Sequence, residues 1–223
     1  MRRKAKIIIG DVYHVFTKSI AGFKIFNNQK EFLRMEALLQ YYQIKNLSRS
    51  FAQYLKLEEI KKDGFHKPYS CFPQTGEKLV QIISYCIMPT HLHLILKQTN
   101  EGGVSIFMGN ILNSYSRYFN TRHKRKGPLW EGRFKNVLVE TDEQLLHLTR
   151  YIHLNPVTAH LVNDLSDWLW SSYKEYTLDS LEKDRLCNFD DLLEIKGEQY
   201  REFIEDRISY QRHLAKIKAL LLD

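Results

Sequence analysis

Two histidines stand one residue apart in the apolar segment YCIMPTHLHLILKQ, residues 85–98. The segment after the proline alternates in polarity, which predicts a strand, and side chains two positions apart in a strand point to the same face. His91 and His93 should therefore project together, with the intervening leucines on the opposite face. Neutral imidazole binds divalent metals well, so this pair could hold one ion. The alternative is two hydrogen-bonded structural histidines; a zinc finger is not expected, because no cysteine stands at ligand spacing nearby.

A metal held by two histidines needs a further ligand, and the segment RYIHLNPV, residues 150–157, offers one. Tyr151 and Asn155 are four residues apart on a predicted helix and therefore share a face, at the flank of its apolar stripe. His153 should point nearly opposite to that stripe. If the helix packs beside the histidine strand, the two histidines and Asn155 could hold one metal next to the phenol. The spacing alone is weak evidence in a chain with 13 tyrosines, and a core-edge aromatic is the alternative.

The elements that must position these residues follow from periodicity and from turn signals. We expect strands over residues 11–18, 79–87, 91–97 and 134–140, and helices over residues 27–43, 50–62, 103–123 and 141–155. The proline after Asn155 predicts that the last of these helices ends there. This order predicts an α+β fold, a ferredoxin-like antiparallel sheet with helices on one face.

The chain is expected to divide near residue 157. Residues 1–157 would form the domain that carries the candidate site, with a helical and loop insertion at about 46–79. Residues 158–223 would form a mainly helical C-terminal extension, with its longest helix over 198–222.

The net charge of +7 is concentrated in the segment RYFNTRHKRKGPLWEGRFK, residues 117–135. The segment has one acid and four aromatic residues, and its cations are Arg117, Arg122, Lys124, Arg125, Lys126, Arg133 and Lys135. Cations interleaved with aromatic rings suit single-stranded nucleic acid, whose phosphates attract charge and whose unstacked bases pack on rings. A solvated loop between two elements is the alternative.

Composition narrows the class of protein. A chain of 223 residues with 43% hydrophobic residues can build a substantial core. No apolar run approaches the roughly 20 residues that cross a bilayer, and the N-terminus lacks the features of a signal peptide, so we expect no membrane partner. The three cysteines are odd in number and widely spread, which suggests reduced thiols and a cytoplasmic location.

Four motifs occur in order between residue 13 and about residue 176: YCIMPTHLHLIL, NSYSRYFNTRHKRKGPLWEGRFK, RYIHLNPV and WLWSSYKEY. In these motifs and their order the chain resembles the single-tyrosine HUH transposases of the insertion-sequence-200-like family and, within it, the REP-associated tyrosine transposases. Two departures are that residues 46–79 are longer than in many relatives and that Thr90 stands where Asn is common. Neither is expected to touch the chemistry.

The resemblance implies that His91, His93 and Asn155 bind a divalent metal, Mg²⁺ or Mn²⁺, and that Tyr151 is the nucleophile. It implies cleavage and rejoining of single-stranded DNA through a 5′-phosphotyrosine, at hairpin-forming repeats, with single strands and DNA hairpins as partners and a homodimer left open. Tyr115 and Tyr118 are expected to stack or pack, because the residues four positions on cannot bind a cation. Two alternatives are a non-catalytic ferredoxin-like single-stranded nucleic-acid-binding protein and a metal-dependent hydrolase that cuts DNA without becoming attached.

Overall fold

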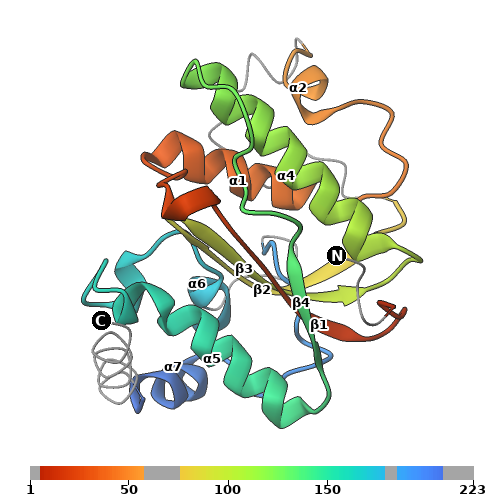
Figure 1. Cartoon of the computed structure of the whole chain (residues 1–223). Helices are drawn as coiled ribbons and strands as arrows, with labels where there is room; N and C mark the ends of the chain where they lie inside the picture. The colour runs from red at the N-terminus through yellow and green to blue at the C-terminus, as the bar shows by residue number, and fades with distance from the viewer. Residues whose placement is uncertain (1–5, 58–75, 179–184, 208–223) are drawn as a thin grey trace.

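The centre of the molecule is a four-stranded antiparallel sheet, seen in a computed structural model that describes residues 6–57, 76–178 and 185–207 (Figure 1). Its strands are β1 (Val12–Lys18), β2 (Val80–Met88), β3 (His91–Gln98) and β4 (Lys135–Val139), and their spatial order is β2-β3-β1-β4. This order, with one helix after β1 and another after β3, is that of a ferredoxin-like sheet. The predicted α+β fold and all four predicted strands are confirmed.

The two crossover helices, α1 (Gln29–Tyr41) and α4 (Gly103–Arg122), lie on one face of the sheet (Figure 1). The Asn28 side chain caps α1 by accepting a hydrogen bond from the Glu31 backbone N–H. At the start of α4, a Cβ on Gly103 would lie 2.0 Å from the carbonyl oxygen of Leu79, so no other residue fits this close approach. The short helix α2 (Phe51–Tyr54) follows α1 and ends before Leu55, so the helix predicted over 50–62 is shorter than expected; residues 58–62 lie outside the described residues.

Helices also cover the opposite face of the sheet. The expectation that the helices lie on one face therefore holds for α1 and α4 only. Helix α5 (Asp142–Thr158) lies there with α6 (Tyr173–Thr177) and α7 (Glu198–Glu205) (Figure 1). The strands explain this arrangement, because β2 is buried at eight of its nine positions. A strand that is apolar on both faces must be covered on both faces.

Helix α5 continues to Thr158, so the prediction that it ends at Asn155 was wrong. Pro156 has no N–H and leaves the carbonyl oxygen of Ile152 without its helical hydrogen bond. The side-chain Nδ2 of Asn155 lies 3.4 Å from that oxygen and donates to it, which lets the helix tolerate the proline.

His153 is completely buried, so the expectation that it points away from the core was also wrong. Its Nε2 lies 2.7 Å from Ser172 Oγ and 3.1 Å from Ser84 Oγ, and its Nδ1 lies 2.7 Å from the Tyr200 hydroxyl. Two of these partners, Ser172 and Tyr200, belong to the C-terminal extension. The extension therefore covers a side of α5 that would be exposed in an isolated helix.

The described part of the extension shares one hydrophobic core with the sheet. It contains the 3-10 helix η2 (Leu165–Asp167), α6 and α7, joined by longer irregular segments. Of the helix predicted over 198–222, the structure shows α7 over Glu198–Glu205, followed by a turn at residues 206–207; positions from 208 on lie outside the described residues. No helix in the described ranges is long and apolar enough to cross a membrane. Cys86 and Cys187 are buried free thiols.

Candidate active site

A cleft of about 660 Å³ brings together the predicted site residues from two elements that are distant in sequence. His91 and His93 enter it from β3, and Tyr151 and Asn155 enter it from α5. The β1–β3 register places Phe16 opposite His93, and Phe16 also lines the cleft. The metal site considered in the sequence analysis requires α5 to pack beside the histidine strand, and in the structure it does.

Each metal-candidate histidine has one ring nitrogen occupied and one available. His91 Nδ1 lies 2.9 Å from the Thr90 hydroxyl, and His93 Nδ1 lies 3.0 Å from Nε2 of His14. The two rings are 5.0 Å apart between centroids and nearly perpendicular, at 87°. These contacts leave the two Nε2 atoms as the candidate ligand atoms. They also correct one expectation, because Thr90 contacts a candidate ligand directly.

Burial keeps the imidazoles neutral, which is the form that binds metals. Removal from water is the main cause that lowers the pKa of His91 to about 4 and that of His93 to about 3. The pKa of His14 falls to about 4 for the same reason. All three rings are therefore uncharged at neutral pH.

Tyr151 stands at the mouth of the cleft with 43% of its surface exposed. Its ring meets the His93 ring edge-on, with centroids 5.9 Å apart, and the His14 ring at 6.3 Å. Partial burial raises the pKa of its phenol, so the hydroxyl stays protonated at neutral pH. The tyrosine is accessible to a substrate, but its chemistry needs help from its surroundings.

Asn155 presents its amide in a defined orientation. Its Nδ2 donates to the carbonyl oxygen of Tyr151 at 3.1 Å as well as to that of Ile152, so its Oδ1 is the atom left to bind a ligand. Within the described ranges, no group of three His, Cys, Asp or Glu side chains could hold a metal ion. Two imidazole nitrogens and an amide oxygen are nevertheless a suitable donor set for a divalent cation, with positions left for water and phosphate oxygens.

Sequence reasoning missed three other ionisable residues that line this cleft: His14, Lys18 and Glu131. His14 and Lys18 come from β1, at alternating positions that point to the histidine face. The alternation is visible in VYHVFTK, but only the pairing of β1 with β3 shows that His14 meets His93. Glu131 is held nearby because its backbone N–H donates to the carbonyl oxygen of Lys18 at 2.9 Å.

The structure does not gather the seven predicted DNA-binding cations in one place. Lys126, Arg133 and Lys135 are exposed on the loop and on β4. Lys124 and Arg125 line a small pocket at the end of α4. The remaining two, Arg117 and Arg122, line a separate groove.

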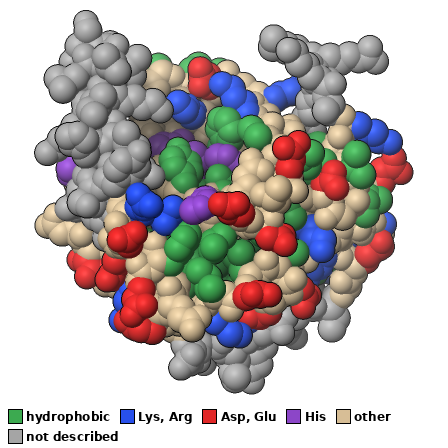
Figure 2. All heavy atoms as spheres, turned by 90° about the horizontal axis from the view of Figure 1, so that it is seen from below, with side chains coloured by type: hydrophobic (Ala, Val, Ile, Leu, Met, Phe, Trp, Pro, Cys, Tyr) green, Lys and Arg blue, Asp and Glu red, His purple; other side chains and the backbone are tan. Residues whose placement is uncertain are grey.

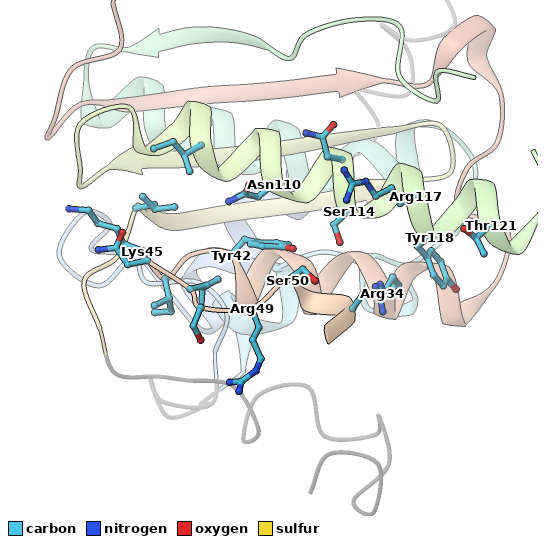
Figure 3. Close-up of a pocket in the computed structure, with 18 of the residues that line it drawn as sticks. Arg34, Tyr42, Lys45, Arg49, Ser50, Asn110, Ser114, Arg117, Tyr118 and Thr121 are labelled. Carbon is cyan, nitrogen blue, oxygen red and sulfur yellow. The ribbon is translucent and has the colours of Figure 1, made fainter. Parts of the chain in front are cut away.

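This groove has a volume of about 1050 Å³ and runs between α4, α1 and the segment that follows α1 (Figure 3). Arg34 lies within it, with its guanidinium 4.4 Å from the centroid of the Phe51 ring and 5.0 Å from that of Tyr118. The Nε atom of Arg34 is buried and has no hydrogen-bond partner among the described residues. Arg117 and Arg34 form no ion pair within the described residues, whereas Arg122 Nε lies 3.7 Å from the buried Glu31 carboxylate. The groove therefore has cationic groups available to an anion.

Tyr115, Tyr118 and Trp130 do not line the cleft. Tyr115 is buried, and its hydroxyl donates to the carbonyl oxygen of Ile25 at 2.6 Å. Tyr118 is half-buried in the groove, and Trp130 packs in the core with its Nε1 donating to the carbonyl oxygen of Leu112.

Figure 2 shows the molecule from below, the side of α5 and α7, where histidines lie among apolar side chains with basic and acidic groups around them.

Comparison with known proteins agrees with the resemblance predicted from the sequence. Residues 58–155 match a family model described as "Transposase IS200 like". A curated protein of Haemophilus influenzae (strain ATCC 51907 / DSM 11121 / KW20 / Rd), named "Putative REP-associated tyrosine transposase", is 27% identical over 115 residues. That alignment covers 47% of this chain and 65% of the relative. The predicted family resemblance is confirmed.

One solved structure is also similar to this chain. It is described as "Structure of the REP associates tyrosine transposase bound to a REP hairpin", with 17% identity and a TM-score of 0.49. The match covers 79% of this chain and 84% of that one.

Proposed function

We propose that this chain, whose residues 58–155 match the IS200-like transposases, cleaves and rejoins single-stranded DNA through a covalent linkage to Tyr151. The observation that carries the proposal is the shared cleft, in which one accessible phenol stands beside two neutral histidines and an oriented amide. The match includes the histidine pair, the tyrosine and the asparagine. If the histidines had only a structural role, or if Tyr151 were only an aromatic residue at the edge of the core, these residues would not need to line the same cleft.

His91 Nε2, His93 Nε2 and Asn155 Oδ1 would hold a divalent cation, Mg²⁺ or Mn²⁺. When bound, such a cation would polarise the scissile phosphate and stabilise its developing negative charge. Thr90 and His14 keep the two imidazoles in place, and the bonds of Asn155 to its own helix keep the amide in place.

In the proposed reaction, the Tyr151 oxygen attacks the phosphorus and forms a P–O bond while the bond from phosphorus to the 3′ oxygen breaks. The phenol loses its proton to solvent, and the departing oxygen takes up a proton to become a 3′-OH. The 5′ phosphate remains on the tyrosine as a phosphodiester. Attack by that hydroxyl, or by another 3′-OH, reverses the step and joins strands without ATP.

The groove of Arg34, Arg117 and Arg122 is a candidate site for the phosphate backbone of the DNA, such as a hairpin stem. Its support is that these three arginines line the groove together with Ser50, Ser114 and Asn110, which carry hydroxyl and amide groups. All of these residues except Arg122 are labelled in Figure 3. It lies beside the crossover helices, whereas the cleft lies beside α5. One DNA molecule could thus be held at one site and cut at the other.

Covalent capture tests the proposed function directly. The full chain is incubated with Mn²⁺ or Mg²⁺ and a single strand labelled on the side 3′ of the cut, and the products are separated on a denaturing gel. Tyr151→Phe should keep the fold and the binding of DNA but form no labelled protein, because only the hydroxyl is removed. Tyr118→Phe, which changes a tyrosine of the groove, should still become labelled.

Each alternative function predicts a different result. A hydrolase that uses water would release cut DNA without labelling the protein. A non-catalytic binder would neither cut nor become labelled. If Tyr151→Phe still becomes labelled, the proposed nucleophile is wrong.

A further inference from the structure

A tight turn separates the catalytic cleft from a second, smaller pocket. Ala21 and Gly22 line the cleft, and the next residue, Phe23, lines a pocket of about 550 Å³. Consecutive Cα atoms are only about 3.8 Å apart, so the two sites are neighbours along one stretch of backbone. A strand whose phosphate lies in the cleft needs only to cross this turn to reach the pocket.

The turn is held firmly to the segment that precedes the histidine strand. The Ser19 N–H donates to the carbonyl oxygen of Thr90 at 2.8 Å, and the N–H groups of Ile25 and Phe26 both donate to that of Pro89. Ala21 itself adopts a left-handed conformation, with φ of 50°. Phe23 therefore has a fixed position relative to His91.

Phe23 exposes 51% of its surface although it is a large apolar residue. It contacts Phe119 edge-on, with an interplanar angle of 89° and centroids 6.3 Å apart. Because the two rings are nearly perpendicular, Phe119 does not stack on the Phe23 ring. The Phe119 ring in turn packs on His123 at 4.2 Å.

The other side chains of the pocket are polar or cationic. Arg125 lies with its guanidinium 5.9 Å from the centroid of the Phe23 ring, and it is fixed there because it donates to Asn120 Oδ1 and to the carbonyl oxygen of Pro128. Lys124 is exposed at the rim. In the part of the chain that the structure describes, no carboxylate lines this pocket, although the buried carboxylate of Glu31 lies 2.7 Å from Nε2 of the lining residue His123. An accessible ring framed by cations suits a nucleobase with its flanking phosphate.

We propose that this pocket binds one base of the DNA strand whose phosphate is cut in the cleft. The base stacks on Phe23, and Lys124 and Arg125 lie beside its phosphates. The inference rests on the proposed function and deepens it, because it makes Phe23 the residue that positions the strand near the cut.

The experiment uses a short single strand selected for binding to the full chain, in which each position in turn is replaced by an abasic site. Binding is measured by fluorescence anisotropy, and formation of the covalent adduct is measured on a denaturing gel. One position close to the cut should respond to base removal by about 5- to 150-fold, the range expected for loss of one stacked base. Phe23→Ala should weaken the intact strand by a similar factor and should abolish the response at that position.

Two variants serve as controls. Phe23→Trp should restore both binding and the response to the abasic site, because it restores an aromatic surface. Leu169→Ala removes an equally exposed apolar residue of the extension, 53% exposed, and should change neither. A fluorescent base analogue at the responsive position should be quenched in the unaltered protein and bright in Phe23→Ala.

Three outcomes would overturn the inference: no effect of Phe23→Ala, an unchanged abasic response in that variant, or no quenching. Failure of the proposed function looks different, because then no strand forms an adduct with Tyr151. The anisotropy and quenching measurements need no adduct and test the pocket in either case.

Discussion

The Nε2 atom of His14 lies 3.0 Å from the Nδ1 atom of His93, across the β1–β3 pair. Only one of these nitrogens can carry the shared hydrogen. For His93 Nε2 to bind a metal, the proton must sit on His93 Nδ1 and be donated to His14, which then acts as an acceptor. His14 is thus placed to select the tautomer of His93 that binds metal.

Replacing His14 should therefore weaken metal binding without removing a ligand. We expect His14→Phe to raise the Mn²⁺ concentration that half-saturates adduct formation by about 10- to 100-fold, the usual cost of losing such a partner. His14→Gln, which retains an acceptor oxygen, should recover part of the loss. A metal titration of adduct formation checks both variants, and equal behaviour of the two would show that the hydrogen bond is unimportant.

Asn155 offers a second test of the donor set, because its oxygen and its nitrogen have different roles. Asn155→Ala should reduce metal-dependent adduct formation at least tenfold, by the same kind of ligand loss. Asn155→Asp should retain more activity, because a carboxylate also supplies an oxygen ligand. The fold should be checked by thermal unfolding, since both variants remove the bond to the carbonyl oxygen freed by Pro156. If the two variants are equally impaired in adduct formation and equally stable, Asn155 is not a ligand.

The groove beside α4 predicts a salt-dependent contribution to DNA binding. Arg117→Gln should weaken hairpin binding and reduce the slope of log affinity against log salt by about 1, because one fewer counterion is released. Lys196→Gln removes the same charge from the extension, where Lys196 pairs with Asp190, and serves as the control of equal net charge. Equal salt slopes in the two variants would mean that the groove does not contact phosphate.

Glu36 predicts a pH dependence of stability that is independent of the active site. Burial raises its pKa to about 8, and its Oε1 accepts a hydrogen bond from the Tyr85 hydroxyl at 3.0 Å. The folded state then holds a proton that the unfolded state releases above its ordinary pKa of about 4.3. Stability from this group is fully present below that value and is lost as pH rises toward 8.

Glu36→Gln should remove this dependence, because its amide cannot ionise. The difference in free energy of unfolding between the variant and the unaltered protein should change by up to about 1.4 kcal/mol per pH unit between pH 5 and 8, in favour of the variant at high pH. Urea unfolding at several pH values measures it. A difference that is constant with pH would show that Glu36 is ionised in the folded protein.

Local periodicity in the sequence predicted much of the secondary structure and which site residues share a face. The period of two in β3 places His91 and His93 on one face, and the spacing of four in α5 places Tyr151 with Asn155, because backbone geometry alone sets both repeats. The strand order along the chain was also sufficient to predict the ferredoxin-like class. These inferences do not depend on which helices and strands pack against each other.

The tertiary structure decided everything that depends on which faces meet. The pairing of β1 with β3 brings His14 to His93, and packing of α5 against the second face brings Tyr151 to the histidines. His153 was misjudged because it is buried between β2 and the extension, and no pattern within α5 reveals these contacts. Contacts of this kind join residues far apart in sequence, and they form because apolar surface on both sides of the sheet must be removed from water.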